Sequence, residues 1–177
     1  MPDSTKTYSE LQESRISSFL DWKRVSGSGS RPGIPGDIIS EDWLGECKTH
    51  TKEGHKITFS AKVWSKIQDE ASSKFKKPAL FVDDGSQKLD RTWCLFPFTY
   101  TPYGLDLMLK AGFSIMELPE SFVRDNINFT LKQMETACKK AVGQKDSSGI
   151  IFEVRFGGMA CAVCDLDTFK ELDYEWL

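Results

Sequence analysis

The sequence predicts an α/β (α+β) fold in which a mixed central β-sheet is flanked by helices. This prediction rests on two kinds of segment, amphipathic helices and short buried strands. Apolar residues recur at helical spacing in residues 8–22 and 60–75, whereas residues 79–82 and 92–98 are short apolar segments bounded by turns, as buried strands are. Helical and strand segments therefore alternate along the first half of the chain in the order α-β-β-α-β-β.

The first half begins with a helix over residues 8–22, in which Leu11, Ile16, Phe19 and Leu20 are the apolar residues. The stretch SGSGSRPGIPG, residues 26–36, is rich in Ser, Gly and Pro and is typical of a mobile functional loop. Strands follow at 37–39 and 43–49 around a turn at 40–42. A polar, basic connection at 50–57 leads to the helix at 60–75, and a turn at 83–86 separates the last two strands of this half.

The second half predicts a short helix over residues 103–111 and a longer one over 121–142, with Ser121 as its N-cap and Gly143 ending it. Strands at 150–156 and 159–164 are joined by a Gly-Gly pair, as in a hairpin. The acidic segment 165–177 is interpreted as a solvated helix end or a dimer contact. We expect residues 1–98 to form a core and residues 99–177 an α+β extension packed on it, so that the two parts make one compact unit.

Composition describes a folded protein without a membrane span. The 177 residues are 40% hydrophobic and 28% charged, with a net charge of −3. No apolar run approaches the ~18 residues of a transmembrane helix. The N-terminus lacks the apolar region of a secretory signal, and an odd number of irregularly spaced cysteines suits reduced thiols, so we expect a cytoplasmic protein. Cys161 and Cys164 have no second pair of zinc ligands and are expected to be buried core thiols.

Positive charge is concentrated in one part of the chain. Residues 48–77 contain 8 lysines against 3 acidic residues, together with both histidines. This excess is compatible with a solvated lysine-rich helix face and equally with a surface that follows phosphate groups.

The stretch GDIISEDWLGECKTH, residues 36–50, contains the strongest candidate site. Alternation along a strand places Glu46 and Lys48 on one side and Cys47 on the other, and a hairpin would bring Asp37 close to Glu46. Mg²⁺ binds one or two carboxylates and keeps water and phosphate oxygens as its other ligands, so this set suits metal-assisted hydrolysis of a phosphodiester. Residues 21–23 have the same carboxylate-x-Lys spacing, but they fall on the predicted first helix.

The stretch SGSGSRPGIPGDIISEDWLGECK resembles the core of the PD-(D/E)XK nuclease superfamily and is most similar to the archaeal-type Holliday-junction resolvases. The following helix, SAKVWSKIQDEASSKF, and the strand PALFV resemble the same family, so the likeness covers residues 10–98. It implies a restriction-endonuclease-like fold, dependence on Mg²⁺ with Mn²⁺ as a substitute, and a homodimer that cuts branched DNA in recombination or replication. The aspartate follows Gly36 here, not proline, and the Asp-to-Glu spacing is that of a tight hairpin.

The resemblance also implies functional residues outside the Asp-Glu-Lys set. The family uses a glutamate of the first helix as a further metal or water ligand, and Glu13 fits better than Glu10 because it lies at the edge of the apolar face; the alternative is that both are solvated charges. The other candidates are DNA-binding residues, for each of which a plain surface or loop role is the alternative: Arg24, Ser28, Ser30, Arg31, His50, Lys52, Lys62 and Lys66.

Other functions remain open from the sequence. A restriction-type, flap or nicking nuclease would use the same chemistry on another DNA target. A non-catalytic DNA-binding protein with a vestigial nuclease fold is a different class, but the presence of Asp37, Glu46 and Lys48 argues against it, since a decayed site would be expected to lose one of them.

Overall fold

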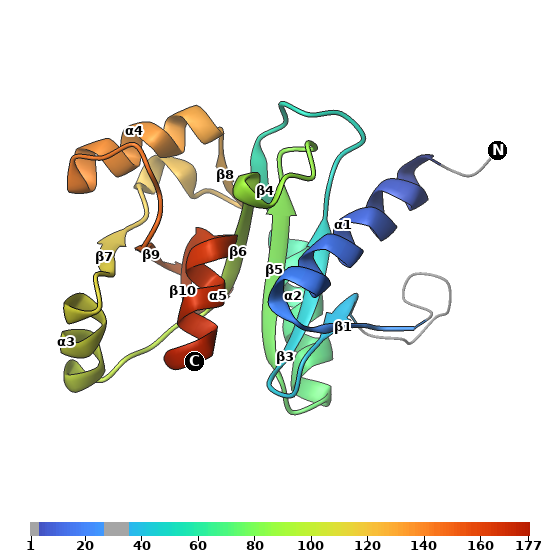
Figure 1. The fold of residues 1–177 in the computed structure, drawn as a ribbon, viewed down its shortest axis with the longest axis horizontal. Helices are drawn as coiled ribbons and strands as arrows, with labels where there is room; N and C mark the ends of the chain where they lie inside the picture. The colour runs from blue at the N-terminus through green and yellow to red at the C-terminus, as the bar shows by residue number, and fades with distance from the viewer. Residues whose placement is uncertain (1–3, 27–35) are drawn as a thin grey trace.

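The computed structural model of the chain describes residues 4–26 and 36–177 (Figure 1). The helices are α1 (Ser4–Leu20), α2 (Ala61–Ser73), α3 (Pro102–Lys110), α4 (Leu131–Val142) and α5 (Leu166–Glu175), with two short 3-10 helices, η1 (Leu89–Arg91) and η2 (Glu120–Phe122). The strands are β1 (Lys23–Arg24), β2 (Ile38–Ile39), β3 (Trp43–Lys48), β4 (Ile57–Phe59), β5 (Lys77–Asp83), β6 (Thr92–Pro97), β7 (Ser114–Glu117), β8 (Ile127–Phe129), β9 (Ile150–Phe156) and β10 (Met159–Asp165).

Eight strands form one mixed sheet in the order β1-β2-β3-β5-β6-β10-β9-β7, and β4 pairs with β8 in a separate small sheet. The pairs β3–β5 and β7–β9 are parallel, and the remaining neighbours in the large sheet are antiparallel. The mixed central sheet flanked by helices confirms the predicted fold class. Because β6 pairs with β10, the sheet runs without a break from the first half of the chain into the second.

Helices cover both faces of the sheet, because alternate strand residues point to opposite sides. Leu44 and Leu80 face the core formed with α2, α4 and the small sheet, while Trp43 and Phe81 face a second core formed with α1, α3 and α5. Figure 1 shows α1 and α5 in front of the strands and α2 behind them. The chain is therefore a three-layer structure with an apolar core on each side of the sheet.

The two cysteines near the C-terminus show this alternation clearly. Cys161 belongs to the core on the α2 side and Cys164 to the core on the α1 side, and both are buried free thiols. The prediction of buried core cysteines is confirmed.

Two predictions of helix α1 and its surroundings need revision. The helix begins four residues earlier than expected and ends at Leu20, where Asp21 takes a left-handed conformation (φ 58°). Leu11 is 45% exposed, and the polar Gln12 occupies the buried position beside it at 2% exposure. The helix thus buries an amide where the apolar pattern predicted a leucine.

The prediction of one helix over residues 121–142 was wrong. Helix α4 begins at Leu131, behind a capping box in which the Thr130 hydroxyl accepts from the Gln133 N–H and the Gln133 side chain accepts from the Thr130 N–H. The preceding residues form η2 and β8, and β8 pairs antiparallel with β4, a strand that was not predicted between the connection at 50–57 and the helix that follows. This pairing joins residues about 70 positions apart, so local periodicity could not reveal it.

The interpretation of residues 165–177 as a solvated helix end was also wrong. Asp165 caps α5 through its side chain, which accepts from the N–H of Thr168. Phe169 and Leu172 are fully buried, and the Phe169 ring makes edge contacts with Trp22, Trp43, Phe81 and Phe96. Helix α5 is a covering element of the sheet.

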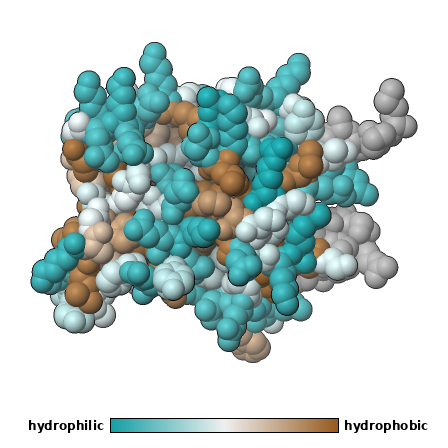
Figure 2. All heavy atoms as spheres, viewed as in Figure 1, coloured by the Kyte–Doolittle hydropathy of each residue, from teal (hydrophilic) through white to brown (hydrophobic). Residues whose placement is uncertain are grey.

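The surface seen in the same view is mostly hydrophilic, and apolar side chains appear as separated patches between polar ones (Figure 2). Across residues 4–26 and 36–177, none of the helices has both the length and the apolar composition that crossing a membrane requires.

Candidate functional site

The β2–β3 hairpin brings Asp37 against the strand that carries Glu46 and Lys48. Ile38 pairs with Gly45, the N–H of Asp37 donates to the Gly45 carbonyl at 2.8 Å, and the Asp37 carboxylate accepts from the N–H of Cys47 at 2.9 Å. Asp37 is therefore fixed beside residues 45–47 by its backbone and by its side chain.

A glycine immediately before this aspartate has a steric reason. Gly36 has φ +69°, and a Cβ atom there would lie 2.6 Å from Cδ1 of Leu44. Any larger residue would have to displace Leu44 and adopt a left-handed backbone. The close approach of the chain to β3 therefore favours glycine at this position.

Glu46 and Lys48 follow Leu44 on the α2 side of the sheet, with Cys47 in the opposite core, as alternation predicted. Glu46 is only 8% exposed, and Lys48 Nζ lies 3.2 Å from its Oε1. Burial, and then the negative charge of Asp37, raise the pKa of Glu46, while Lys48 and Lys66 oppose the shift. Two carboxylates and an ammonium group are therefore brought together at the end of β3.

Glu13 of α1 is the glutamate of the first helix that belongs to this group. Burial and the charge of Asp37 raise its pKa, whereas Glu10 is exposed. Arg24 is engaged with it, because its Nη2 lies 3.0 Å from Glu13 Oε2 and its Nη1 donates to the Ser14 hydroxyl at 3.3 Å. The structure places Arg24 beside the acidic group as a partner of Glu13.

Gln12 was not identified from the sequence, although it connects α1 to the site. Its Nε2 donates to the Lys48 carbonyl at 2.6 Å and to Asp83 Oδ2 at 3.3 Å. Both partners are acceptors, so only this orientation of the amide makes both bonds. Gln12 is a positioning residue that ties the helix of Glu13 to the strand of Lys48.

Asp83, at the end of β5, is the buried side chain that accepts the second hydrogen bond of Gln12. It is fully buried, and its Oδ1 accepts from the Thr49 hydroxyl and from the Gly85 N–H, both at 2.7 Å. Burial raises its pKa, and these two hydrogen bonds oppose the shift.

Glu70 of α2 is a second residue that sequence reasoning missed. Its Oε2 accepts from the N–H of Gly36 at 3.0 Å, and its Oε1 lies 3.6 Å from Lys66 Nζ. The i,i+4 spacing of Lys66 and Glu70 could have indicated this pair. Glu70 holds the residue before Asp37, and Lys66 is close enough to Glu46 to affect its charge state.

The remaining candidates are less closely connected to the carboxylates. Lys52 and Lys62 are exposed. The rings of His50 and His55 are stacked with centroids 3.9 Å apart, and burial and His55 lower the pKa of His50. Ser28, Ser30 and Arg31 lie outside the described residues.

Asp37 and Glu46 are the side chains of this site that could hold a divalent cation. Within residues 4–26 and 36–177, no three His, Cys, Asp or Glu side chains are arranged as a metal-binding group. Asp37 and Glu46 nevertheless provide two carboxylates, and Mg²⁺ is usually bound through only one or two. Burial, and then the charge of Asp37, raise the pKa of Glu46. A cation between the two carboxylates would relieve their repulsion, so the donor set fits Mg²⁺.

Comparisons of the chain with protein-family models, with curated proteins and with solved structures gave no match.

Proposed function

We propose that the protein is a Mg²⁺-dependent endodeoxyribonuclease, selective for branched DNA such as a Holliday junction, that acts in recombination or replication in the cytoplasm. The observation that carries the proposal is the arrangement of Asp37, Glu46 and Lys48 on one hairpin, with the Lys48 ammonium 3.2 Å from the Glu46 carboxylate. Such an arrangement suits hydrolysis of a phosphodiester.

In this proposal Asp37 and Glu46 hold Mg²⁺, for which Mn²⁺ can substitute, and Glu13 binds a water molecule of the metal. When bound, the metal lowers the pKa of a water molecule and neutralises charge on the scissile phosphate. Lys48 stabilises the negative charge that develops on the phosphate or orients the attacking water. Two hydrogen bonds keep these groups in position: Glu70 accepts from the N–H of Gly36, next to Asp37, and Gln12 donates to the carbonyl of Lys48.

Surface cations near this group supply the affinity for DNA. Phosphate contacts give most of the sequence-independent binding energy. Lys66 is two-thirds exposed on its side chain and lies near Glu46, and the exposed Arg24, Lys52 and Lys62 add positive charge around it. The exposed His50, whose pKa is lowered, would contact the DNA backbone as a neutral hydrogen-bond donor. A homodimer would present two such sites, matching the two-fold symmetry of a four-way junction.

The same residues would serve a restriction-type, flap or nicking nuclease, which differs only in the DNA it selects. The alternative from another class is a non-catalytic DNA-binding protein. The buried position of Glu46 against Lys48 favours catalysis, because a binding surface gains nothing from a carboxylate that burial makes costly to ionise.

The proposal is tested with supercoiled plasmid, linear duplex and a four-way junction, each incubated with Mg²⁺ and with wild-type protein or Asp37→Asn. Asp106→Asn, an exposed change on α3, is the matched control. We expect symmetric paired cuts on the junction by wild type and the control, and none by Asp37→Asn. Equal cleavage of duplex and junction would contradict the proposed selectivity for branched DNA. Failure to cleave any of the three substrates would contradict the proposal that the protein is a nuclease.

A further inference from the structure

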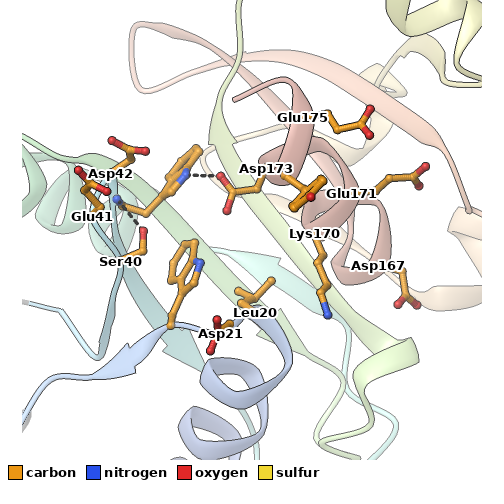
Figure 3. A pocket seen from close by; sticks show the side chains of 13 residues that line it. Leu20, Asp21, Ser40, Glu41, Asp42, Asp167, Lys170, Glu171, Asp173 and Glu175 are labelled. Atoms are coloured by element: carbon orange, nitrogen blue, oxygen red, sulfur yellow. Dashed lines mark hydrogen bonds between the residues drawn. The ribbon is translucent and has the colours of Figure 1, made fainter.

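A pocket of about 610 Å³ lies between the β2–β3 turn, the end of α1 and helix α5 (Figure 3). This volume is within the ~300–1,000 Å³ of typical ligand pockets. The turn leads into Trp43, the first residue of β3, whereas Lys48 is the last. The pocket is therefore at the opposite end of the strand from the candidate nuclease site.

The charge of the pocket is strongly negative. Seven carboxylates line it against a single lysine, Lys170, whose Nζ lies 4.3 Å from the centroid of the Phe19 ring. The carboxylates are those of Asp21, Glu41, Asp42, Asp167, Glu171, Asp173 and Glu175. In the part of the chain that the structure describes, none of the seven forms a salt bridge. The Lys76 ammonium group donates to the backbone carbonyls of Ser40 and Glu41 in the turn.

Two tryptophans of the core lie beneath these charges, Trp22 at 8% and Trp43 at 1% exposure. Trp22 and Trp43 are stacked with centroids 6.2 Å apart and an interplanar angle of 19°. The indole N–H of Trp43 donates to Asp173 Oδ1 at 2.7 Å, the bond drawn in Figure 3. Lys77 Nζ lies 4.4 Å from the centroid of the Trp43 ring, so an ammonium group of the protein itself already covers this indole in a cation–π contact. Tyr174 adds an 89% exposed ring at the pocket rim.

We propose that this pocket is a docking site for a basic peptide segment of a partner protein, with arginine or lysine side chains next to an apolar residue. The carboxylates come from three separate segments, which suits a chain that presents several cations along its length. The exposed Tyr174 ring at the rim suits both the apolar side chain and the guanidinium group of such a segment. Phosphate groups would be repelled, so the occupant is distinct from the DNA proposed for the other site.

The proposal is tested by isothermal titration calorimetry of the full chain with a short peptide of alternating arginine and leucine and blocked termini. The competing probes are the same peptide with glutamate for arginine, and spermidine. The pocket variant is the double substitution Glu171→Gln and Glu175→Gln, at exposed positions. Asp106→Asn with Glu135→Gln is the control, because it changes the net charge equally at exposed positions outside the pocket.

We expect saturable binding of the arginine peptide that weakens with salt, and a Kd that the pocket variant raises by roughly 3- to 10-fold while the control leaves it unchanged. Binding of the arginine peptide that is undetectable, or equal in the pocket variant and the control, would overturn the proposal. Spermidine binding as tightly as the peptide would reassign the pocket to small polycations. Self-association in analytical ultracentrifugation that only the pocket variant abolishes would assign it to a second copy of the chain. The pocket variant is also assayed for cleavage of the four-way junction. If it cleaves the junction but the peptide does not bind, the docking proposal fails while the nuclease proposal stands.

Discussion

Replacement of Gln12 by methionine removes a side chain that joins three elements while keeping its approximate volume. The Lys48 carbonyl loses a 2.6 Å hydrogen bond, and an unsatisfied buried acceptor costs about 1–3 kcal/mol. The bond to Asp83 is longer, at 3.3 Å, and Asp83 keeps its bonds from Thr49 and Gly85, so its loss costs at most ~1 kcal/mol.

One contribution to the free energy of unfolding favours the methionine variant. The Gln12 Oε1 atom is buried without a hydrogen-bond partner in the described structure, and methionine removes that penalty of ~1 kcal/mol. The central values of these three contributions give a net loss for Gln12→Met of about 1.5 kcal/mol in the free energy of unfolding.

Gln12→Glu provides a sharper comparison. At neutral pH it would place a carboxylate oxygen against the Lys48 carbonyl and the Asp83 carboxylate, so we expect it to be less stable than Gln12→Met by more than ~1 kcal/mol. Urea denaturation measures all three proteins, with Leu11→Gln as the control at the exposed neighbouring position. Stability of Gln12→Met within ~0.5 kcal/mol of wild type, or of Gln12→Glu equal to Gln12→Met, would refute the role assigned to this amide.

Three further predictions concern other parts of the structure. Because the pKa of Glu46 is raised above its ordinary 4.5, its contribution to stability is fully present below that value and is lost as the pH rises through the raised pKa. Glu46→Gln should therefore gain stability relative to wild type as the pH rises from about 4 to 7; a difference that is constant with pH in thermal unfolding contradicts this. Gly36→Ala should cost about 1–3 kcal/mol, because of the φ of +69° and the contact with Leu44, and should slow junction cleavage; an unchanged urea midpoint argues against it. Phe169→Ala should cost ~3–5 kcal/mol, since its ring is fully buried among four others, and a loss below ~1 kcal/mol would show that α5 does not cover the core.

The sequence was most informative where local pattern and tertiary structure agree. The helix that became α2 was predicted because Ile67 and Ala71 repeat at helical spacing, and both are buried. Strand alternation placed Glu46 and Lys48 on one side of β3 and Cys47 on the other. The turn at residues 40–42 made the hairpin, and with it the approach of Asp37 to β3, predictable.

The missed features depend on contacts between distant residues. Strands β4 and β8 have three residues each and form by pairing with one another, so neither has a local signal of its own. Gln12 is polar in an apolar pattern, and its burial makes sense only when the Lys48 carbonyl and Asp83 are both next to it. Helix α5 looked solvated because of its acidic residues, yet its Phe169 and Leu172 complete the core over Trp22 and Trp43.

The single-turnover rate at which the protein cleaves a four-way junction in Mg²⁺ tests the central claim most directly. Asp37→Asn, Glu46→Gln and Lys48→Met should each lower this rate by about 100-fold or more, while Glu135→Gln on the exposed face of α4 leaves it unchanged. Circular dichroism shows whether each variant is folded. A wild-type protein that leaves the junction intact, or variants that cut it as fast as wild type, would contradict the assignment of these residues to catalysis.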